Sequence, residues 1–226
     1  DRAARGAWLA DALVTHARIA GDSHVLEVGS GVGETARALA PLLGPEGRYD
    51  GLEVDRAAVG WCRRAYRRDR RFRFVVADVH DPRHNPQGVT APADYRFPYA
   101  DMSVDAVLMP RALAHGLPEA CEQHLAEAAR VLREGGAVVA PFFALNDVSR
   151  TLIARGEAGL AFADPEEDVA VLDDGDPEEA VAYAEEWIFE RLREHGLTLE
   201  GLHPGSWCGR EEHMGFQDLL VAVRHG

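Results

Sequence analysis

The sequence predicts an α/β fold, a doubly wound sheet of mostly parallel strands with helices on both faces. Apolar runs of strand length alternate with helical patterns along the 226 residues, as expected for strands joined by helical crossovers. The turn after the first run is rich in glycine, and the second and third runs each end in an acid. Because the carboxyl ends of parallel strands meet at one edge of a sheet, these features predict a ligand site there.

The first half of the chain contains three predicted strands and the helices around them. A helix is expected over residues 7–19, where apolar residues recur at helical spacing. The strands are predicted over 25–28, 48–53 and 72–78, and the helices between them over 34–43 and 56–67. Gly44 and Pro45 end the helix over 34–43, since both residue types interrupt helices. The proline- and glycine-rich stretch over 80–92 is expected to be a loop.

The second half continues the alternation and then departs from it. A strand is predicted over 105–109, a helix over 118–133 and a strand over 137–143. Residues 147–176 are expected to be irregular, and a helix that carries Tyr183 and Trp187 is predicted over 177–195. Two more strands, near 198–203 and 217–223, bring the sheet to seven. We therefore expect a single domain over 1–226, with residues 147–195 as an acidic cap or insertion.

The glycine spacing distinguishes between two kinds of nucleotide ligand. In the dinucleotide fingerprint the third glycine follows the second by three positions, beneath a pyrophosphate at the helix start. Here Gly29, Gly31 and Gly33 are two apart, and Glu34 takes the fingerprint position, where its carboxylate would repel a pyrophosphate. Glu27 adds a second carboxylate at the end of the preceding strand. The pattern therefore favours a ligand with a cationic centre, such as S-adenosylmethionine (SAM).

Two further acids lie where an adenosine would need them. Glu53 ends the second strand, where a carboxylate can accept hydrogen bonds from both ribose hydroxyls. Asp78 ends the third strand and can accept a hydrogen bond from the adenine amino group, while the Val79 N–H faces a ring nitrogen. Each acid alone is also compatible with a solvated strand end. Their order after the glycine turn favours a nucleoside site.

On these residues the chain resembles the class I SAM-dependent methyltransferases. The resemblance places Glu27, Gly29, Gly31 and Gly33 in the glycine motif, Glu53 at the ribose and Asp78 at the adenine. It implies a Rossmann-like, seven-stranded sheet with one antiparallel strand, SAM as cofactor and S-adenosylhomocysteine as product. Later segments are similar to a bacterial subgroup that methylates small molecules such as sugars or secondary metabolites: residues 95–105, 127–136, 176–186, 205–210 and 216–222.

The residues after the fourth strand are the candidates for contact with the methyl acceptor. Pro110 lies at the same sheet edge as the glycine turn, and we assign it to the cofactor site. His115 is the candidate general base for a hydroxyl acceptor, because imidazole titrates near physiological pH. A histidine that only shapes the pocket is the alternative. Phe142 and Phe143 are weaker candidates for the acceptor wall, and no residues show the spacing of a metal site.

Charge and composition restrict the partners of the protein. The net charge of −14 opposes binding to nucleic acid, although seven arginines cluster between residues 63 and 73, which we interpret as a solvated helix face. No apolar run is long enough for a membrane helix. Three widely spaced cysteines indicate a reducing, cytoplasmic setting. We expect a monomer or homodimer.

Three functional hypotheses remain open from the sequence. The first is a methyltransferase that acts on a small-molecule acceptor, with a hydroxyl oxygen as the methylated atom. The second is an NAD-dependent oxidoreductase on a related fold, which the glycine spacing and Glu34 disfavour. The third is a SAM-binding protein without catalytic activity, whose mark would be a blocked acceptor pocket.

Overall fold

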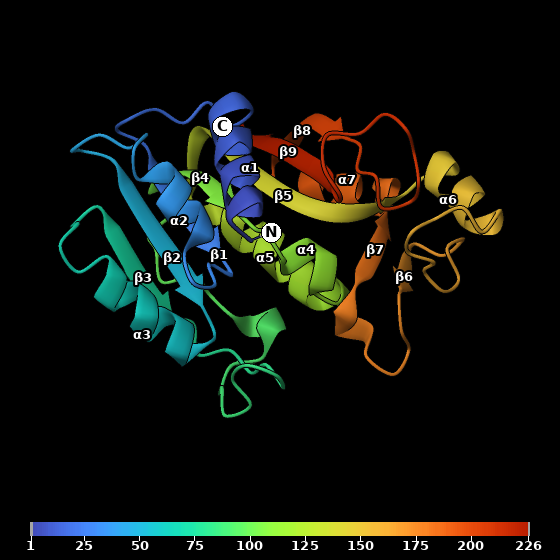
Figure 1. The fold of residues 1–226 in the computed structure, drawn as a ribbon, viewed down its shortest axis with the longest axis horizontal. Coiled ribbons are helices and arrows are strands. Elements are labelled where there is room, and N and C mark those ends of the chain that lie inside the picture. Colours follow the sequence, from blue (N-terminus) through green and yellow to red (C-terminus); the bar gives the residue numbers. More distant parts are fainter. Residues whose placement is uncertain (1, 226) are drawn as a thin grey trace.

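The computed structural model describes residues 2–225, which form a single curved sheet with helices packed against it (Figure 1). Within these residues nine strands join in the order β3-β2-β1-β4-β5-β7-β6, and β9 pairs with both β5 and β8. The strands are β1 (His24–Val28), β2 (Arg48–Glu53), β3 (Phe72–Val76), β4 (Val104–Leu108), β5 (Leu132–Leu145), β6 (Val169–Val171), β7 (Val181–Ala184), β8 (Leu197–His203) and β9 (Asp218–Arg224). The order β3-β2-β1-β4-β5 is typical of a doubly wound sheet.

The helices alternate with these strands along most of the chain. They are α1 (Arg2–Thr15), α2 (Glu34–Leu39), α3 (Arg56–Ala65), α4 (Ala112–His115), α5 (Pro118–Val131), α6 (Asp147–Ala154) and α7 (Glu185–Glu194), with short 3₁₀ turns η1 (Pro92–Asp94) and η2 (Pro177–Glu179). Most begin or end within a few residues of their predicted limits. Helix α1 begins five residues before its predicted start, α7 begins eight residues after its own, and α4 and α6 were not predicted.

The sheet divides at β5, the longest strand. Its residues Ala137–Phe142 pair with the antiparallel strand β9, whereas Phe143–Leu145 pair with the parallel strand β7. Strands β1 to β5 lie parallel to one another, so the mostly parallel sheet predicted from the sequence is confirmed. The predicted number of seven strands is wrong, because the antiparallel pair β6 and β7 extends the end of β5.

The helix predicted over 177–195 is also wrong in its first half. Val181–Ala184 form strand β7, and all four residues are buried, although the stretch is rich in helix-forming alanine and glutamate. The free edge at the end of β5 supplies hydrogen-bond partners for this segment, so tertiary pairing overrides local propensity. Tyr183 therefore lies on a strand, and it stacks on Trp187 of α7 at 4.7 Å between ring centroids.

Residues 147–176 are likewise more regular than predicted. Helix α6 begins at a capping box, in which the Asn146 side chain accepts the Ser149 N–H and the Ser149 hydroxyl accepts the Asn146 N–H. Strand β6 follows, so the segment contains a helix and a strand joined by loops. The sequence carried the capping signal only weakly, since serine replaces the usual acid or amide three residues after the cap.

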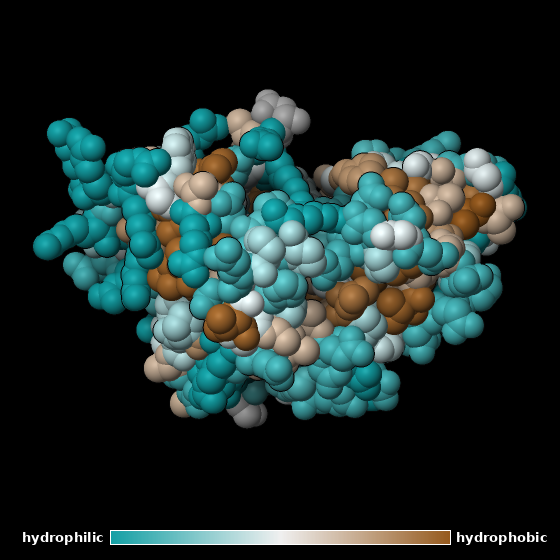
Figure 2. Space-filling view, turned by 90° about the horizontal axis from the view of Figure 1, so that it is seen from below, coloured by the Kyte–Doolittle hydropathy of each residue, from teal (hydrophilic) through white to brown (hydrophobic). Residues whose placement is uncertain are grey.

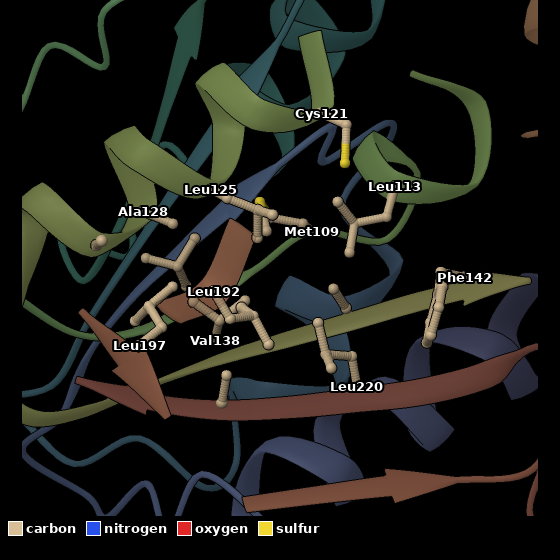
Figure 3. Packing of buried hydrophobic residues seen from close by; sticks show 14 of the residues in the cluster. Met109, Leu113, Cys121, Leu125, Ala128, Val138, Phe142, Leu192, Leu197 and Leu220 are labelled. Atoms are coloured by element: carbon tan, nitrogen blue, oxygen red, sulfur yellow. The ribbon is translucent and has the colours of Figure 1, made fainter. Parts of the chain in front are cut away.

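Alternate strand residues enter two separate hydrophobic clusters. Leu26, Val107 and Val138 pack in one cluster with residues of α5 and α7. Their neighbours Val25, Ala106 and Val139 pack in another with residues of α1, α2 and α3. Since successive strand residues point to opposite faces, the two clusters lie on opposite sides of the sheet. Figure 3 shows the first, with Leu125 and Cys121 of α5 beside Met109 and Leu113.

Helix α1 approaches the start of α2 very closely, which matters for the site described below. A Cβ atom added at Gly6 would lie 2.6 Å from the backbone carbon of Glu34. Only glycine permits this separation. The contact brings the N-terminal turns of α1, with Arg2 and Arg5, to the sheet edge where the glycine turn lies.

Candidate functional site

The glycine turn between β1 and α2 has the backbone conformation that its glycines require. Gly29, Gly31 and Gly33 all have positive φ, at 86°, 53° and 76°, a region that other L-residues rarely adopt. The Gly29 and Ser30 N–H groups donate to the Leu52 carbonyl at 2.8 and 3.0 Å, which fixes the turn against β2. A Cβ atom added at Gly29 would meet no atom within 4 Å, so this stretch of backbone is open to a ligand.

Glu53 connects the turn to the next βα unit. One carboxylate oxygen accepts the Gly31 N–H at 2.7 Å and the other accepts the Asp55 N–H at 2.9 Å. Asp55 in turn caps α3 by accepting the Ala57 N–H. Because each carboxylate oxygen can accept more than one hydrogen bond, Glu53 retains acceptor capacity for two ribose hydroxyls.

Glu27 is a buried carboxylate beneath the turn. Its side chain accepts hydrogen bonds from the Thr35 hydroxyl at 3.1 Å and from the Tyr49 hydroxyl. It is 3% exposed, and this burial raises its pKa to about 8 despite the two hydrogen bonds. A cationic ligand beside Glu27 would supply the countercharge that the protein itself provides only through the more distant Arg5. The residue therefore fits the sulfonium and ammonium groups of SAM.

A cavity of about 530 Å³ joins the glycine turn to the loop after β4. Of the residues predicted from the sequence, seven line it: Glu27, Gly29, Gly31, Glu53, Val79, Pro110 and His115. They come from the carboxyl ends of β1, β2, β3 and β4, which is where ligands bind in open α/β sheets. The structure thus brings together residues spread over nearly ninety positions of the chain.

Two predicted cofactor residues do not line this cavity. Gly33 caps α2, and a Cβ atom there would contact Cys62 and Tyr66 at 3.4 Å, so its absence lets α2 and α3 pack. The Asp78 carboxylate pairs with Arg56 at 3.0 Å and is nearly half exposed. Contact with an adenine amino group would require this ion pair to open.

The two phenylalanines proposed for the acceptor wall lie elsewhere. Phe142 is buried in the cluster formed with α5 and α7, and Phe143 packs against Phe162 and Trp207 beyond the end of β5. Neither side chain reaches the cavity. The prediction was wrong because the end of β5 is covered by β7 and by the loop before β9, which the sequence did not reveal.

His115 lies at the end of α4 in the cavity wall. Its Nδ1 is 3.2 Å from the Glu178 carbonyl oxygen of η2, which holds the ring. Burial, followed by the charge of Arg111, lowers the pKa of His115 to about 4. The imidazole is therefore neutral at physiological pH. His115 was chosen from the sequence because an ordinary imidazole titrates near physiological pH, and its pKa in the structure lies well below that range.

Four arginines also line the cavity: Arg2, Arg5, Arg83 and Arg111. Of these, only Arg111 lies in a segment that the sequence indicated for the site, and no role was assigned to it. Arg5 donates to the Pro110 carbonyl at 2.8 Å. Arg83 forms an ion pair with Asp176, which joins the loop after β3 to the turn before β7. Both of these segments reach the lower side of Figure 1, and Figure 2 shows that this side is largely hydrophilic, with hydrophobic side chains exposed between the polar ones.

Two kinds of feature are absent from the part of the chain that the structure describes. No group of three or more His, Cys, Asp or Glu side chains within residues 2–225 is arranged to hold a metal ion. In the same range, none of the helices combines the length and apolar character of a membrane span.

Comparison with known proteins relates this site to a family. Residues 25–136, which run from β1 into β5, match a family model described as a methyltransferase domain. This segment contains every residue predicted for the cofactor and His115.

Solved structures share the fold over almost the whole chain. A chain of the complex between the Haloferax volcanii Trm112 methyltransferase activator and a putative methyltransferase has a TM-score of 0.63 at 18% identity, covering 99% of this chain and 92% of that one. A SAM-dependent methyltransferase from Methanosarcina mazei gives 0.60 at 17% identity, covering 92% and 94%. Geranyl diphosphate methyltransferase in complex with SAM gives 0.58 at 14% identity, covering 98% and 85%.

The Rossmann-like fold, the glycine turn and the family match define this protein as a methyltransferase. Its cofactor is SAM, which the buried Glu27 and the open backbone at Gly29 fit.

Proposed function

We propose that this methyltransferase transfers the methyl group of SAM to a hydroxyl oxygen of a small molecule. The observation that carries the proposal is the continuous cavity that extends from the glycine turn to His115. Its volume, about 530 Å³, is in the range of sites for small ligands. The net charge of −14 argues against a nucleic-acid acceptor.

The cofactor half of the cavity needs only to bind and orient. Bound SAM supplies a methyl group on a positively charged sulfonium, which is already an excellent leaving group. Glu53 offers carboxylate oxygens to the ribose, and the backbone at Gly29 and Gly31 permits close approach. Glu27 offers a buried carboxyl group whose ionised form a cationic ligand would favour. Alignment of acceptor and methyl group then supplies most of the acceleration.

His115 is the residue in the cavity best suited to accept the proton of a hydroxyl acceptor. The Glu178 carbonyl can only accept a hydrogen bond, so the Nδ1 atom of His115 donates. This fixes the tautomer in which Nε2 carries the lone pair. In this tautomer Nε2 would accept the hydroxyl proton as the acceptor oxygen takes the methyl carbon and the carbon–sulfur bond breaks. The products would be a methyl ether, S-adenosylhomocysteine and a proton that His115 releases to solvent.

We further propose that residues 147–195 cap the acceptor side of the cavity. Glu178 contributes to the cavity wall, and its carbonyl holds His115. The ion pair between Asp176 and Arg83 connects the same turn to the opposite rim. Opening of this turn would expose the acceptor site to solvent, and closure would exclude water from it.

A labelled-methyl assay tests the proposed acceptor class. The protein is incubated with methyl-labelled SAM and either the ultrafiltrate or the retained macromolecules of a cell extract, with heat-inactivated protein as control. We expect label to enter small molecules of the ultrafiltrate in a form that resists mild alkali, as an ether does. Label confined to the macromolecular fraction, or to an alkali-labile ester, would contradict the proposal.

A further inference from the structure

The charge of the cavity wall differs between its two sides. The side formed by the glycine turn and the end of β2 carries carboxylates, namely Glu27, Glu34, Glu53 and Asp55. Arg2 and Arg5 of α1 approach this side at the start of α2, and the other side carries Arg83 and Arg111 against the acids Asp81 and Glu178.

These arginines differ in how far the protein neutralises them. The charge of Arg5 is offset by Glu27 and Glu34, so it lies toward the cofactor side. Arg83 is paired with Asp176. Arg111 forms no hydrogen bond or ion pair through its side chain with any residue between 2 and 225. Burial and the like charges of Arg5 and Arg83 lower the pKa of Arg111, while the acids Glu53 and Asp81 act in the opposite direction. Its side chain remains exposed in the cavity wall.

The cofactor can account for only part of this positive charge. SAM carries a single carboxylate, on the methionine portion, and Arg5 is placed beside the acids that would face the cationic groups of that portion. Arg111 lies instead at the start of α4, four residues before His115. It would remain unpaired if the acceptor were neutral.

We propose that Arg111, assisted by Arg83, binds a carboxylate or phosphate group of the methyl acceptor. The inference rests on the proposed function, because it assigns the acceptor side of the same cavity. The guanidinium group suits either anion, since its planar array of donors can form two parallel hydrogen bonds to one such group.

The position of Arg111 also restricts the shape of the acceptor. The Arg111 carbonyl accepts the His115 N–H at 3.0 Å, so one turn of helix separates the two residues. One helical turn rises about 5.4 Å. The acceptor class is therefore a compact molecule whose hydroxyl group lies within several ångströms of its anionic group, such as a hydroxy acid, a sugar acid or a sugar phosphate.

An anion bound at Arg111 has a chemical consequence for His115. The groups that face the imidazole are Arg111, Arg5 and the carbonyl groups of Glu178 and Glu179. The two arginines disfavour the protonated ring, and the carbonyls favour it. Neutralisation of Arg111 by the acceptor would make His115 a stronger base only when the acceptor is present.

Calorimetric titration of the protein saturated with S-adenosylhomocysteine tests the inference. Pyrophosphate, inorganic phosphate and acetate serve as separate probes, so that the phosphate and carboxylate arms are distinguished. We expect at least one of them to bind, and Arg111→Gln to weaken that binding by about 10-fold or more, as for loss of a charged hydrogen bond. The matched control is Arg67→Gln, at an exposed position in the basic stretch over residues 63–73. This substitution should leave the anion affinity unchanged.

A second readout separates a binding role of Arg111 from a structural one. The pKa of His115, followed by NMR and assigned with His115→Gln, should rise from about 4 in Arg111→Gln and also when the anion binds the wild-type protein. Equal anion affinities in the two proteins would overturn the inference, as would loss of S-adenosylhomocysteine binding in Arg111→Gln. If the wild-type protein binds S-adenosylhomocysteine but no anion, the inference alone fails. If it binds no S-adenosylhomocysteine, the proposed function fails.

Discussion

The two sides of the cavity are built in different ways. On the glycine-turn side the backbone forms the site, and positive φ values at Gly29 and Gly31 determine which residues the sequence must place there. On the acceptor side, side chains from the loop after β3, the loop after β4 and η2 converge. A site made from backbone leaves a local pattern in the sequence. A site made from distant side chains does not, because its members are brought together only by the fold.

The largest effect is expected on the acceptor side, at His115. If His115 is the base, His115→Ala should lower turnover by about 10²–10⁴-fold, while affinity for S-adenosylhomocysteine stays unchanged. The exposed His213 provides the control substitution, His213→Ala. Near-normal turnover in His115→Ala would show that positioning alone carries the reaction. Lost cofactor binding would place His115 on the cofactor side instead.

The pH dependence of the same residue sharpens this comparison. His115 must be unprotonated to act as base, so activity should fall as pH drops through its pKa. In the free enzyme that pKa is about 4, and kcat/KM should show its acid limb there. An anionic acceptor that neutralises Arg111 would move the limb of kcat to higher pH, since kcat reports the complex. If the acid limbs of the kcat and kcat/KM profiles fall at the same pH, the coupling between Arg111 and His115 is contradicted.

On the cofactor side, Glu53 and Asp78 form a matched pair of acids at neighbouring strand ends. Glu53→Ala should weaken binding of S-adenosylhomocysteine by about 1–3 kcal/mol, because ribose hydroxyls and the Gly31 N–H lose their acceptor. Asp78→Ala should change the affinity by less than about twofold, since its carboxylate pairs with Arg56 outside the cavity wall. Calorimetric titration of both variants with S-adenosylhomocysteine measures the two affinities. A larger loss in Asp78→Ala would show that the ion pair opens to contact adenine.

Replacement of Glu27 by glutamine should stabilise the folded protein at high pH but weaken its binding of SAM. Burial raises its pKa from 4.5 to about 8, so the native state prefers the protonated form, and ionisation removes stability as pH rises through this interval. A native pKa that lies one pH unit above the unfolded pKa corresponds to about 1.4 kcal/mol of free energy of unfolding. Glu27→Gln cannot ionise. Its melting temperature relative to wild type should therefore rise between pH 5 and pH 9, while its affinity for SAM falls.

Thermal melting at a series of pH values, with and without SAM, checks this prediction. Tyr49→Phe is an informative companion, because it removes one hydrogen bond to the same carboxylate without removing the charge. A difference in melting temperature between Glu27→Gln and wild type that does not vary with pH would contradict the assigned ionisation.

The smallest effect concerns the proposed cap. Residues 156–190 contain no arginine or lysine, so trypsin cannot probe them, whereas a glutamate-specific protease can cut after Glu178 and Glu179. S-adenosylhomocysteine with pyrophosphate should slow this cleavage, and Asp176→Asn should speed it up to about fivefold, the limit for an exposed ion pair. Cleavage after Glu211 serves as internal control. Unchanged cleavage in the turn, with protection elsewhere, would argue against a cap.

Much of the central sheet was predictable because its signals are local. The strands β1, β2 and β3 are short apolar runs that end at glycine or acid, and the structure places each within two residues of its predicted limits. The glycine motif and Glu53 were predictable for the same reason, since they lie in contiguous βα units.

The rest depends on contacts between distant segments. Strand β7 has helix-forming residues and becomes a strand only because the end of β5 offers a free edge. Arg5 reaches the cavity only because Gly6 lets α1 approach α2. Asp78 carries the expected residue type, but Arg56 holds its side chain away from the cavity. The low pKa of His115 likewise arises from burial and from Arg111, which no local pattern reports.

The most direct test of a cavity with two separate functions is a comparison of two ligands in two variants. Binding of S-adenosylhomocysteine and of pyrophosphate is measured by calorimetry in Glu53→Ala and in Arg111→Gln. The account predicts that Glu53→Ala weakens only S-adenosylhomocysteine and that Arg111→Gln weakens only pyrophosphate. If either variant weakens both ligands to a similar degree, the two sides are not separate sites, and the assignment of Arg111 to the acceptor is contradicted.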